Sequence, residues 1–227
     1  MANVTVKAQF MLNTGELISM SGTLAEGTES ELQTNTDYST AATSIGQFAN
    51  GKVLTHIVQP PTAPNGIAYA YIERRGAIVC ALPVAIDGVQ DEPLPMPQAV
   101  QLQAGDTLQV LCNTASNRTF AYSVITGQGV HAIFSGTPSG AGDTDLTHIL
   151  SGQSIGQSLT GQMVVRHFAS SVDGSKLSTG GVLCLNDRGL PVGGCSATNP
   201  NQLQPAFNAL GGYMVNLNFV ARVTTSS

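Results

Sequence analysis

The sequence predicts an all-β fold, a jelly roll or β-sandwich that contains two similar β units and an N-terminal arm. Apolar and polar residues alternate over Val4–Phe10, with the period of a half-buried strand. Ile67–Glu73 alternates in the same period, with Ile67, Tyr69 and Tyr71 on one face and Ala68, Ala70 and Ile72 on the other. Loops rich in proline and glycine, such as Pro60–Gly66, separate these stretches. No stretch has the spacing of an amphipathic helix. About ten to twelve short strands between frequent turns are typical of a sandwich, jelly roll or barrel.

The chain divides into an N-terminal segment, two β units and a short linker. Residues 1–51 start with a strand and then become rich in glycine, threonine, serine and acidic residues, so we expect an extended arm after the strand. Residues 52–135 form the first predicted unit, 136–143 the linker and 144–227 the second unit. The two units are also compatible with packing as one domain.

An internal repeat favours the two units. The tetrapeptide Leu-Thr-His-Ile occurs at residues 54–57 and again at 146–149. A duplicated unit would make His56 equivalent to His148. Chance is the alternative, because short matches arise easily in a chain rich in threonine and leucine. A duplicated unit would also make Cys80 equivalent to Cys184.

The chain has few charged residues and no concentration of basic ones. Charged residues make up 10% of the sequence and the net charge is −5, whereas roughly 25% of the residues in a typical globular protein are charged. The basic residues are scattered, apart from Arg74–Arg75. We therefore expect no direct nucleic-acid binding, which relies on several clustered phosphate contacts. The N-terminus does not read as a secretory signal, and no apolar run reaches the roughly 18 residues of a membrane span.

The cysteines and histidines lack the spacing of a metal site. No cysteine pair has C-x-x-C spacing, so we predict no zinc site. We interpret the cysteines as buried thiols, with a disulfide such as Cys184–Cys195 as the alternative. No histidine has a second histidine or a carboxylate at ligand spacing, so we predict structural roles. These residues are Cys80, Cys112, Cys184, Cys195, His56, His131, His148 and His167.

Acidic residues crowd a proline-rich loop and the predicted linker. We interpret them as solvated, with a weak Ca²⁺ site as the alternative. The sequence has neither a G-x-S-x-G nucleophile elbow nor a glycine-rich phosphate loop in a strand–loop–helix context. We therefore predict no enzyme, no catalytic residue, and no cofactor or metal. The acids are Asp87, Asp91, Glu92, Asp143 and Asp145.

General features of the chain resemble viral structural proteins. It starts directly on a strand at Met1–Val6, its loops are rich in Thr, Gly, Asn and Gln, and Leu102–Leu108 reads as strand, Gly-Asp turn and strand. In that turn we expect Asp106 to cap backbone amides and Gly105 to adopt a positive φ. With its low charge, the chain resembles the β-rich capsid and decoration proteins of tailed phages and of icosahedral dsDNA viruses with jelly-roll coats.

The resemblance implies a structural virion protein that self-assembles into, or decorates and stabilises, an icosahedral capsid. The expected partners are further copies of the chain, in a trimer or larger array, and other capsid proteins. The expected location is the virion, assembled in the host cytoplasm. Coats of single-stranded RNA viruses commonly carry a basic arm, which this chain lacks, so we expect no direct packaging of a genome. The alternatives are another self-assembling surface, tail or fibre β-protein, and a carbohydrate-binding or hydrolytic β-sandwich.

Scarcity of charge also predicts association. Burying Thr, Gln or Asn against a neighbour costs little when its hydrogen bonds are met across the interface or by water. Burying an unpaired Lys or Glu is far more costly. We expect residues 1–51 to reach a neighbouring subunit, as an added strand or as an arm that fills a groove.

Overall fold

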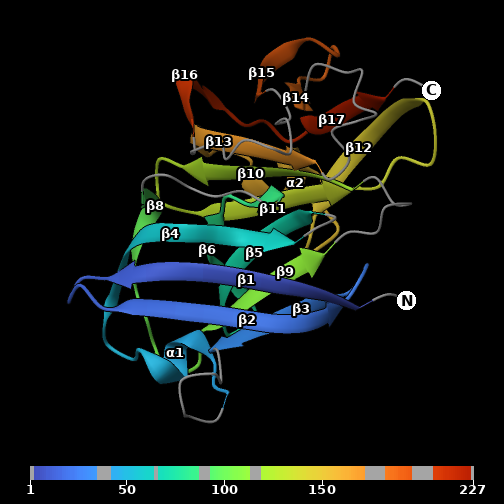
Figure 1. The fold of residues 1–227 in the computed structure, drawn as a ribbon. Helices are drawn as coiled ribbons and strands as arrows, with labels where there is room; N and C mark the ends of the chain where they lie inside the picture. The colour runs from blue at the N-terminus through green and yellow to red at the C-terminus, as the bar shows by residue number, and fades with distance from the viewer. Residues whose placement is uncertain are drawn as a thin grey trace. The chain divides into compact units, whose positions relative to one another are not determined.

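The structure, a computed structural model, confirms the all-β prediction and shows two similar units (Figure 1). It describes residues 3–34, 42–63, 66–86, 93–112, 119–171, 182–195 and 207–225. Unit 1 comprises Met1–Thr114 with Asn201–Pro205, and unit 2 comprises Ala115–Pro200 with Ala206–Ser227. Each unit has its own sheet and its own buried hydrophobic core.

Unit 1 contains a Greek key. Its hydrogen-bonded strand order is β6-β5-β9-β3-β2-β1-β4-β7, and β8 pairs with β4 off this path. The run β4-β1-β2-β3 is the Greek-key order, in which the fourth strand returns to lie beside the first. The helix α1 is a single turn between β3 and β4. The elements are β1 (Asn3–Leu12), β2 (Leu17–Ala25), β3 (Glu29–Thr34), α1 (Ile45–Phe48), β4 (Val53–Ala63), β5 (Ile67–Arg74), β6 (Ala77–Leu82), β7 (Ala85–Ile86), β8 (Leu94–Gln101) and β9 (Thr107–Cys112).

Unit 2 repeats this strand order element by element. Its order is β15-β14-β17-β12-β11-β10-β13-β16. It becomes the order of unit 1 when β10 is matched with β1 and each later strand with its counterpart; the short β7 has no counterpart among the described residues. The elements are β10 (Phe120–Thr126), β11 (His131–Gly136), β12 (Gly142–His148), α2 (Ile155–Leu159), β13 (Met163–Ser171), β14 (Val182–Leu185), β15 (Pro191–Cys195), β16 (Phe207–Met214) and β17 (Val220–Thr225).

The match extends to the capping of the two short helices. Each begins with the sequence Ser-Ile-Gly-Gln, at residues 44–47 and 154–157. Ser44 caps α1 and Ser154 caps α2, in both cases by accepting a hydrogen bond from the backbone N–H of the glutamine three residues later. A serine in this position satisfies one of the amides that a helix start leaves unpaired.

The strand registers also coincide. Phe10 of β1 lies opposite Ile57 of β4, and Val124 of β10 lies opposite His167 of β13. Two residues further along β1 and β10 the partner strand skips one residue, so both pairings carry a bulge at the same place. Corresponding positions can therefore be compared residue by residue.

The observed repeat differs from the predicted one in boundary and register. Unit 2 begins at Ala115, and the expected linker, residues 136–143, contains the last residue of β11 and the first two residues of β12. Residues 54–57 lie in β4, whereas Leu146 lies in β12, the counterpart of β3. His56 and His148 are therefore not equivalent. Cys80 and Cys184 are not equivalent either, because they lie on β6 and β14, and β14 is the counterpart of β5.

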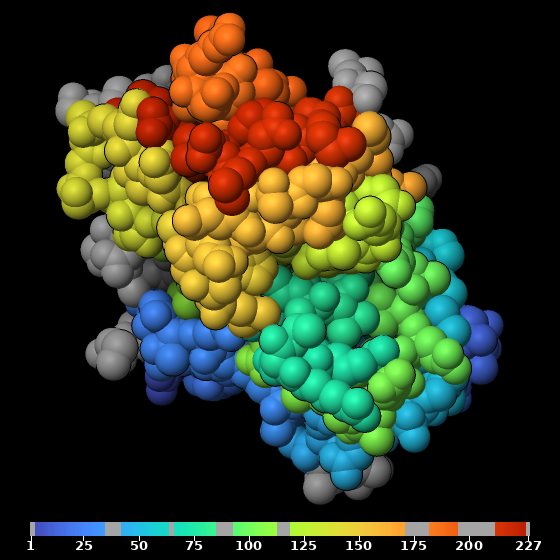
Figure 2. All heavy atoms as spheres, turned by 180° about the vertical axis from the view of Figure 1, so that it is seen from behind, coloured from blue at the N-terminus to red at the C-terminus, as the bar shows by residue number. Residues whose placement is uncertain are grey.

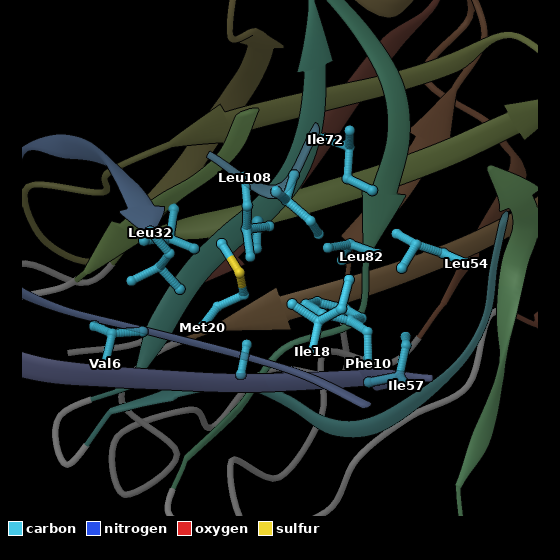
Figure 3. Close-up of a cluster of buried hydrophobic side chains, with 14 of the residues drawn as sticks. Val6, Phe10, Ile18, Met20, Leu32, Leu54, Ile57, Ile72, Leu82 and Leu108 are labelled. Atoms are coloured by element: carbon cyan, nitrogen blue, oxygen red, sulfur yellow. The ribbon is translucent and has the colours of Figure 1, made fainter. Parts of the chain in front are cut away.

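The predicted N-terminal arm is not observed either. Residues 3–34 form β1, β2 and β3, and their apolar side chains build the core of unit 1 together with those of β4 and β9 (Figure 3). Val6, Phe10 and Leu32 are completely buried. Fully burying side chains of this size stabilises a fold by about 1.5–3 kcal/mol each. These strands are integral to unit 1, so a deletion of residues 1–51 would remove part of its core.

Candidate functional site

The acidic residues predicted to lie in loops divide into two groups. Asp87, Asp91 and Glu92 lie outside the described residues. Asp143 and Asp145 lie on β12, where Arg222 of β17 bridges them. Among the residues that the structure describes, no group of three or more His, Cys, Asp or Glu is placed to hold a metal ion.

Arg222 is held by a two-point contact. Its Nε and Nη2 donate to the two carboxylate oxygens of Asp145 at 2.6 and 3.1 Å, and Nη1 lies 3.5 Å from Asp143. Hydrogen bonding to Asp145 raises the pKa of Arg222 above its ordinary value. All three side chains are substantially exposed, so water and salt screen this contact.

Unit 1 carries acids at the corresponding positions but no arginine. Glu31 lies opposite Gln109, just as Asp145 lies opposite Arg222. Burial and the nearby charge of Glu73 raise the pKa of Glu31. The neighbouring Glu29 accepts hydrogen bonds from the hydroxyls of Tyr69 and Tyr71 at 3.0 and 2.8 Å. Burial, followed by this carboxylate, raises the pKa of both phenols, so both stay protonated and act as donors.

The Gly-Asp turn of unit 1 is built around a buried ion pair. The carboxylate of Asp106 is fully buried and accepts from Arg74 Nε and Nη2, both at 2.7 Å, and from the backbone N–H of Gln103 at 2.9 Å. The last bond confirms the predicted capping role of Asp106. The prediction for Gly105 was wrong, because this residue does not have a positive φ; the aspartate alone closes the turn.

A hydrogen-bonded chain of polar side chains lies in the core of unit 2. The hydroxyl of Tyr122 is 2.9 Å from His167 Nδ1 and 2.8 Å from the hydroxyl of Tyr213. Tyr213 also forms a hydrogen bond with Cys184. All four residues are buried. We call these four residues the His167 chain.

At the positions that correspond to the His167 chain, unit 1 has apolar residues. Ile57 of β4 occupies the position of His167 on β13, and Ala8 of β1 occupies that of Tyr122 on β10. The other two positions show the same exchange. Val100 of β8 corresponds to Tyr213 of β16, because the first lies opposite the second residue of β4 and the other opposite the second residue of β13. Ile72 of β5 corresponds to Cys184 of β14.

Burial decides the protonation states within the His167 chain. It lowers the pKa of His167 and raises that of the Cys184 thiol to about 12, an effect that the Tyr213 hydrogen bond partly offsets. A protonated thiol is not a nucleophile. The two tyrosine hydroxyls connect the imidazole to the thiol through hydrogen bonds. At neutral pH the thiol is protonated, so it is not an activated nucleophile.

The remaining cysteines and histidines have structural environments. Cys80, Cys112 and Cys184 are free and buried, which confirms the interpretation as thiols for these three; the side chain of Cys195 lies outside the described residues. Burial raises the pKa of Cys80 to about 12 and that of Cys112 to about 11. Burial lowers the pKa of His148, whose ring packs against Phe134 at 5.5 Å between centroids.

Several exposed apolar side chains lie at strand ends and turns at the end of unit 2 that carries α2. We call this region the helix end of unit 2. Its members lie at strand ends and turns: Met163 begins β13 and faces Met214, the last residue of β16. The β14–β15 hairpin (orange) and the C-terminal strand β17 (red) lie side by side on this unit (Figure 2). The members are Val130, Leu150, Met163, Leu190, Met214 and Leu217, each between 39% and 59% exposed.

Unit 1 has polar or small residues at several of the corresponding positions. Glu16 takes the place of Val130: each follows a positive-φ glycine, and its carbonyl closes the first hairpin turn of its unit at 2.9 Å. Glu16 forms an ion pair with Lys52. Gln101 and Ala104 take the places of Met214 and Leu217. The helix ends of the two units therefore differ at these three positions, although unit 1 has exposed apolar side chains of its own at this end, Leu17 at the start of β2 and Phe48 on α1.

The sequence alone predicted neither the His167 chain nor the helix end of unit 2. His167 was assigned a structural role, and its partners Tyr122 and Tyr213 come from strands far apart in the chain. The signal that would have found them is the repeated Ser-Ile-Gly-Gln, because it sets the true register and shows where one copy is polar and the other apolar.

No protein-family model matches this chain, and no curated protein or solved structure matches it either. No helix in the described part of the chain is long and apolar enough to span a membrane.

Proposed function

We propose that this chain is a structural virion subunit, which self-assembles into an icosahedral capsid or decorates and stabilises one. The observation that carries the proposal is the helix end of unit 2, where six apolar side chains are exposed and where unit 1 has Glu16, Gln101 and Ala104 at the positions of Val130, Met214 and Leu217. Exposed apolar groupings of this kind mark association surfaces in soluble proteins.

The composition supports the same proposal. Only 10% of the residues are charged, and interface cores are depleted of charge relative to the rest of a protein surface. Each unit has a sheet and a buried core of its own, so its surface is presented on a folded unit. The proposed partners are further copies of this chain, in a trimer or larger array, together with other capsid proteins.

The carbohydrate-binding alternative is less well supported. Carbohydrate-binding sites commonly stack sugar rings on exposed aromatic side chains. Among the large hydrophobic side chains that are exposed in the described residues, only Phe48 is aromatic. The other self-assembling alternative, a tail or fibre subunit, uses the same association surface but would produce open filaments in place of closed shells.

The test grafts the surface of unit 1 onto unit 2. The triple variant Val130→Glu, Met214→Gln, Leu217→Ala gives three exposed positions the residues that unit 1 has there. We expect the wild-type chain to form oligomers in light scattering as its concentration rises, and the triple variant to need at least roughly tenfold more protein, since every 1.4 kcal/mol is a factor of ten in affinity.

The matched control is Leu183→Thr, which removes an exposed apolar side chain on β14 away from the helix end. It should assemble like the wild type. A wild-type chain that stays monomeric at high concentration contradicts the proposal, and a triple variant that assembles normally rules out the helix end as the contact. Negative-stain microscopy then separates closed shells from filaments.

A further inference from the structure

The His167 chain places an ionisable imidazole inside a hydrophobic core. His167 and Tyr122 point inward from the neighbouring strands β13 and β10, and Tyr213 and Cys184 complete the chain from β16 and β14. His167 is buried, and its Nδ1 meets the hydroxyl of Tyr122. An imidazolium formed there would therefore meet a phenol at Nδ1 in place of a carboxylate.

A proton on His167 changes what the imidazole can offer to its neighbour. A protonated imidazole donates at both ring nitrogens and accepts at neither, so Nδ1 of an imidazolium can only donate to the hydroxyl of Tyr122. Protonation also places a positive charge in the buried interior of unit 2, where burial disfavours the charged form.

Among the residues that the structure describes in unit 2, the other titratable groups do not compensate for this charge. On the strands packed around His167, β10, β14 and β16 contain no Asp, Glu, Lys or Arg. Arg166 on β13 is exposed, and the carboxylates of Asp143 and Asp145 on β12 are engaged with Arg222. The two further histidines lie on β11 and β12: His131 precedes the core-facing Ala132, and His148 packs on Phe134.

We propose that the His167 chain makes unit 2 an acid-responsive module: mildly acidic pH opens unit 2, whereas unit 1, whose corresponding positions are apolar, stays closed. The species that triggers the opening is a proton that binds to the imidazole of His167. The inference is independent of the proposed virion role, because it concerns the opening of one unit in the isolated chain.

The direction of the effect follows from linkage. The opened state binds a proton near the ordinary histidine pKa of 6.5, whereas burial holds the pKa of His167 in the closed state below that value. Above pH 6.5 neither state is protonated and the site has no effect on opening. Below pH 6.5 the opened state gains a proton that the closed state lacks, so opening becomes up to about tenfold more favourable per pH unit. The dependence ends at the closed-state pKa.

Hydrogen–deuterium exchange of the full chain tests this by comparing the two units in one sample. We expect the exchange of β10, β13 and β16 at pH 5.5, corrected for intrinsic rates, to be up to tenfold faster than at pH 7.5. The corresponding strands β1, β4 and β8 should not change. His167→Ile, which installs the residue of unit 1, should reduce the difference, while His131 and His148, whose pKa values burial also lowers, keep their own contributions. If that variant fails to fold, His167→Gln serves, because it keeps a neutral acceptor.

The control variant is His131→Gln. His131 is also in unit 2, and burial followed by the charge of Arg166 lowers its pKa to about 4, so it too can contribute to acid sensitivity. A response that persists in His167→Ile and disappears in His131→Gln overturns the proposal. Equal acceleration in both units, or an NMR titration of the His167 imidazole at or above pH 6.5, overturns it as well.

Discussion

Replacing Gly46 or Gly156 by alanine should destabilise the unit that contains it. A Cβ at Gly46 would lie 2.0 Å from the carbonyl oxygen of Gln103, and one at Gly156 would lie 2.3 Å from that of Leu217. Ordinary contact begins at 3.4 Å, so the helix and the turn must separate by over an ångström. The separation breaks the bond from each glycine N–H, which donates at 3.0 Å to the carbonyl of Asp106 or Phe219.

The expected destabilisation is about 3 kcal/mol in each case, from about 1–3 kcal/mol of overpacking and about 1 kcal/mol for the lost hydrogen bond. For a unit of this size that lowers the melting temperature by roughly 15 °C. Calorimetry measures the loss, and hydrogen exchange shows which unit carries it.

The control for both variants is Gly105→Ala. A Cβ there meets nothing within 4 Å and φ is not positive, so the change should be within about 0.5 kcal/mol. The reasoning fails if Gly46→Ala or Gly156→Ala melts at the same temperature as Gly105→Ala, because the close approach of helix and turn would then not be required. It fails equally if either variant destabilises the other unit.

Further predictions concern the polar contacts that distinguish the two units. Arg74→Ala should destabilise unit 1 by about 3 kcal/mol in denaturant unfolding, because it leaves the buried carboxylate of Asp106 without its partner. Arg222→Ala should cost less than about 1 kcal/mol in the same assay, because its partners are exposed, and equal losses for the two variants would contradict the burial argument. Tyr122→Phe should cost about 2 kcal/mol in unit 2, since it removes the hydroxyl that lies within hydrogen-bond distance of both His167 and Tyr213, and a neutral outcome would mean that neither bond contributes to stability.

The all-β character could be predicted from the sequence because core-facing strands leave a local pattern. In β1 the buried residues Val4, Val6, Ala8 and Phe10 alternate with more exposed ones. The segment after β1 lacks that pattern. In β3 only Leu32 and Thr34 are buried, so a strand fixed by its pairing with β9, far away in sequence, reads as a loop. Pairing of this kind is non-local and leaves little trace in composition.

The register of the repeat was mispredicted for a related reason. Leu-Thr-His-Ile occurs twice because strands draw on few residue types, and the two copies lie on strands that do not correspond. The informative identity is Ser-Ile-Gly-Gln, in which each small residue has a steric or capping reason to be there. Ser44 and Ser154 cap the helix, and Gly46 and Gly156 leave no room for a Cβ.

The two units share a backbone and differ in the chemistry placed on it, and this difference locates function better than either unit alone. Where the copies agree, as at Gly46 and Gly156, the residue is explained by the fold. Where they differ, the fold demonstrably accepts both solutions, so the choice made in one copy needs another reason. A buried imidazole at the position of Ile57, and exposed Met214 and Leu217 at the positions of Gln101 and Ala104, are choices of that kind. Exchanging these residues between the units therefore changes the chemistry while leaving the scaffold as it is, which makes the units controls for each other.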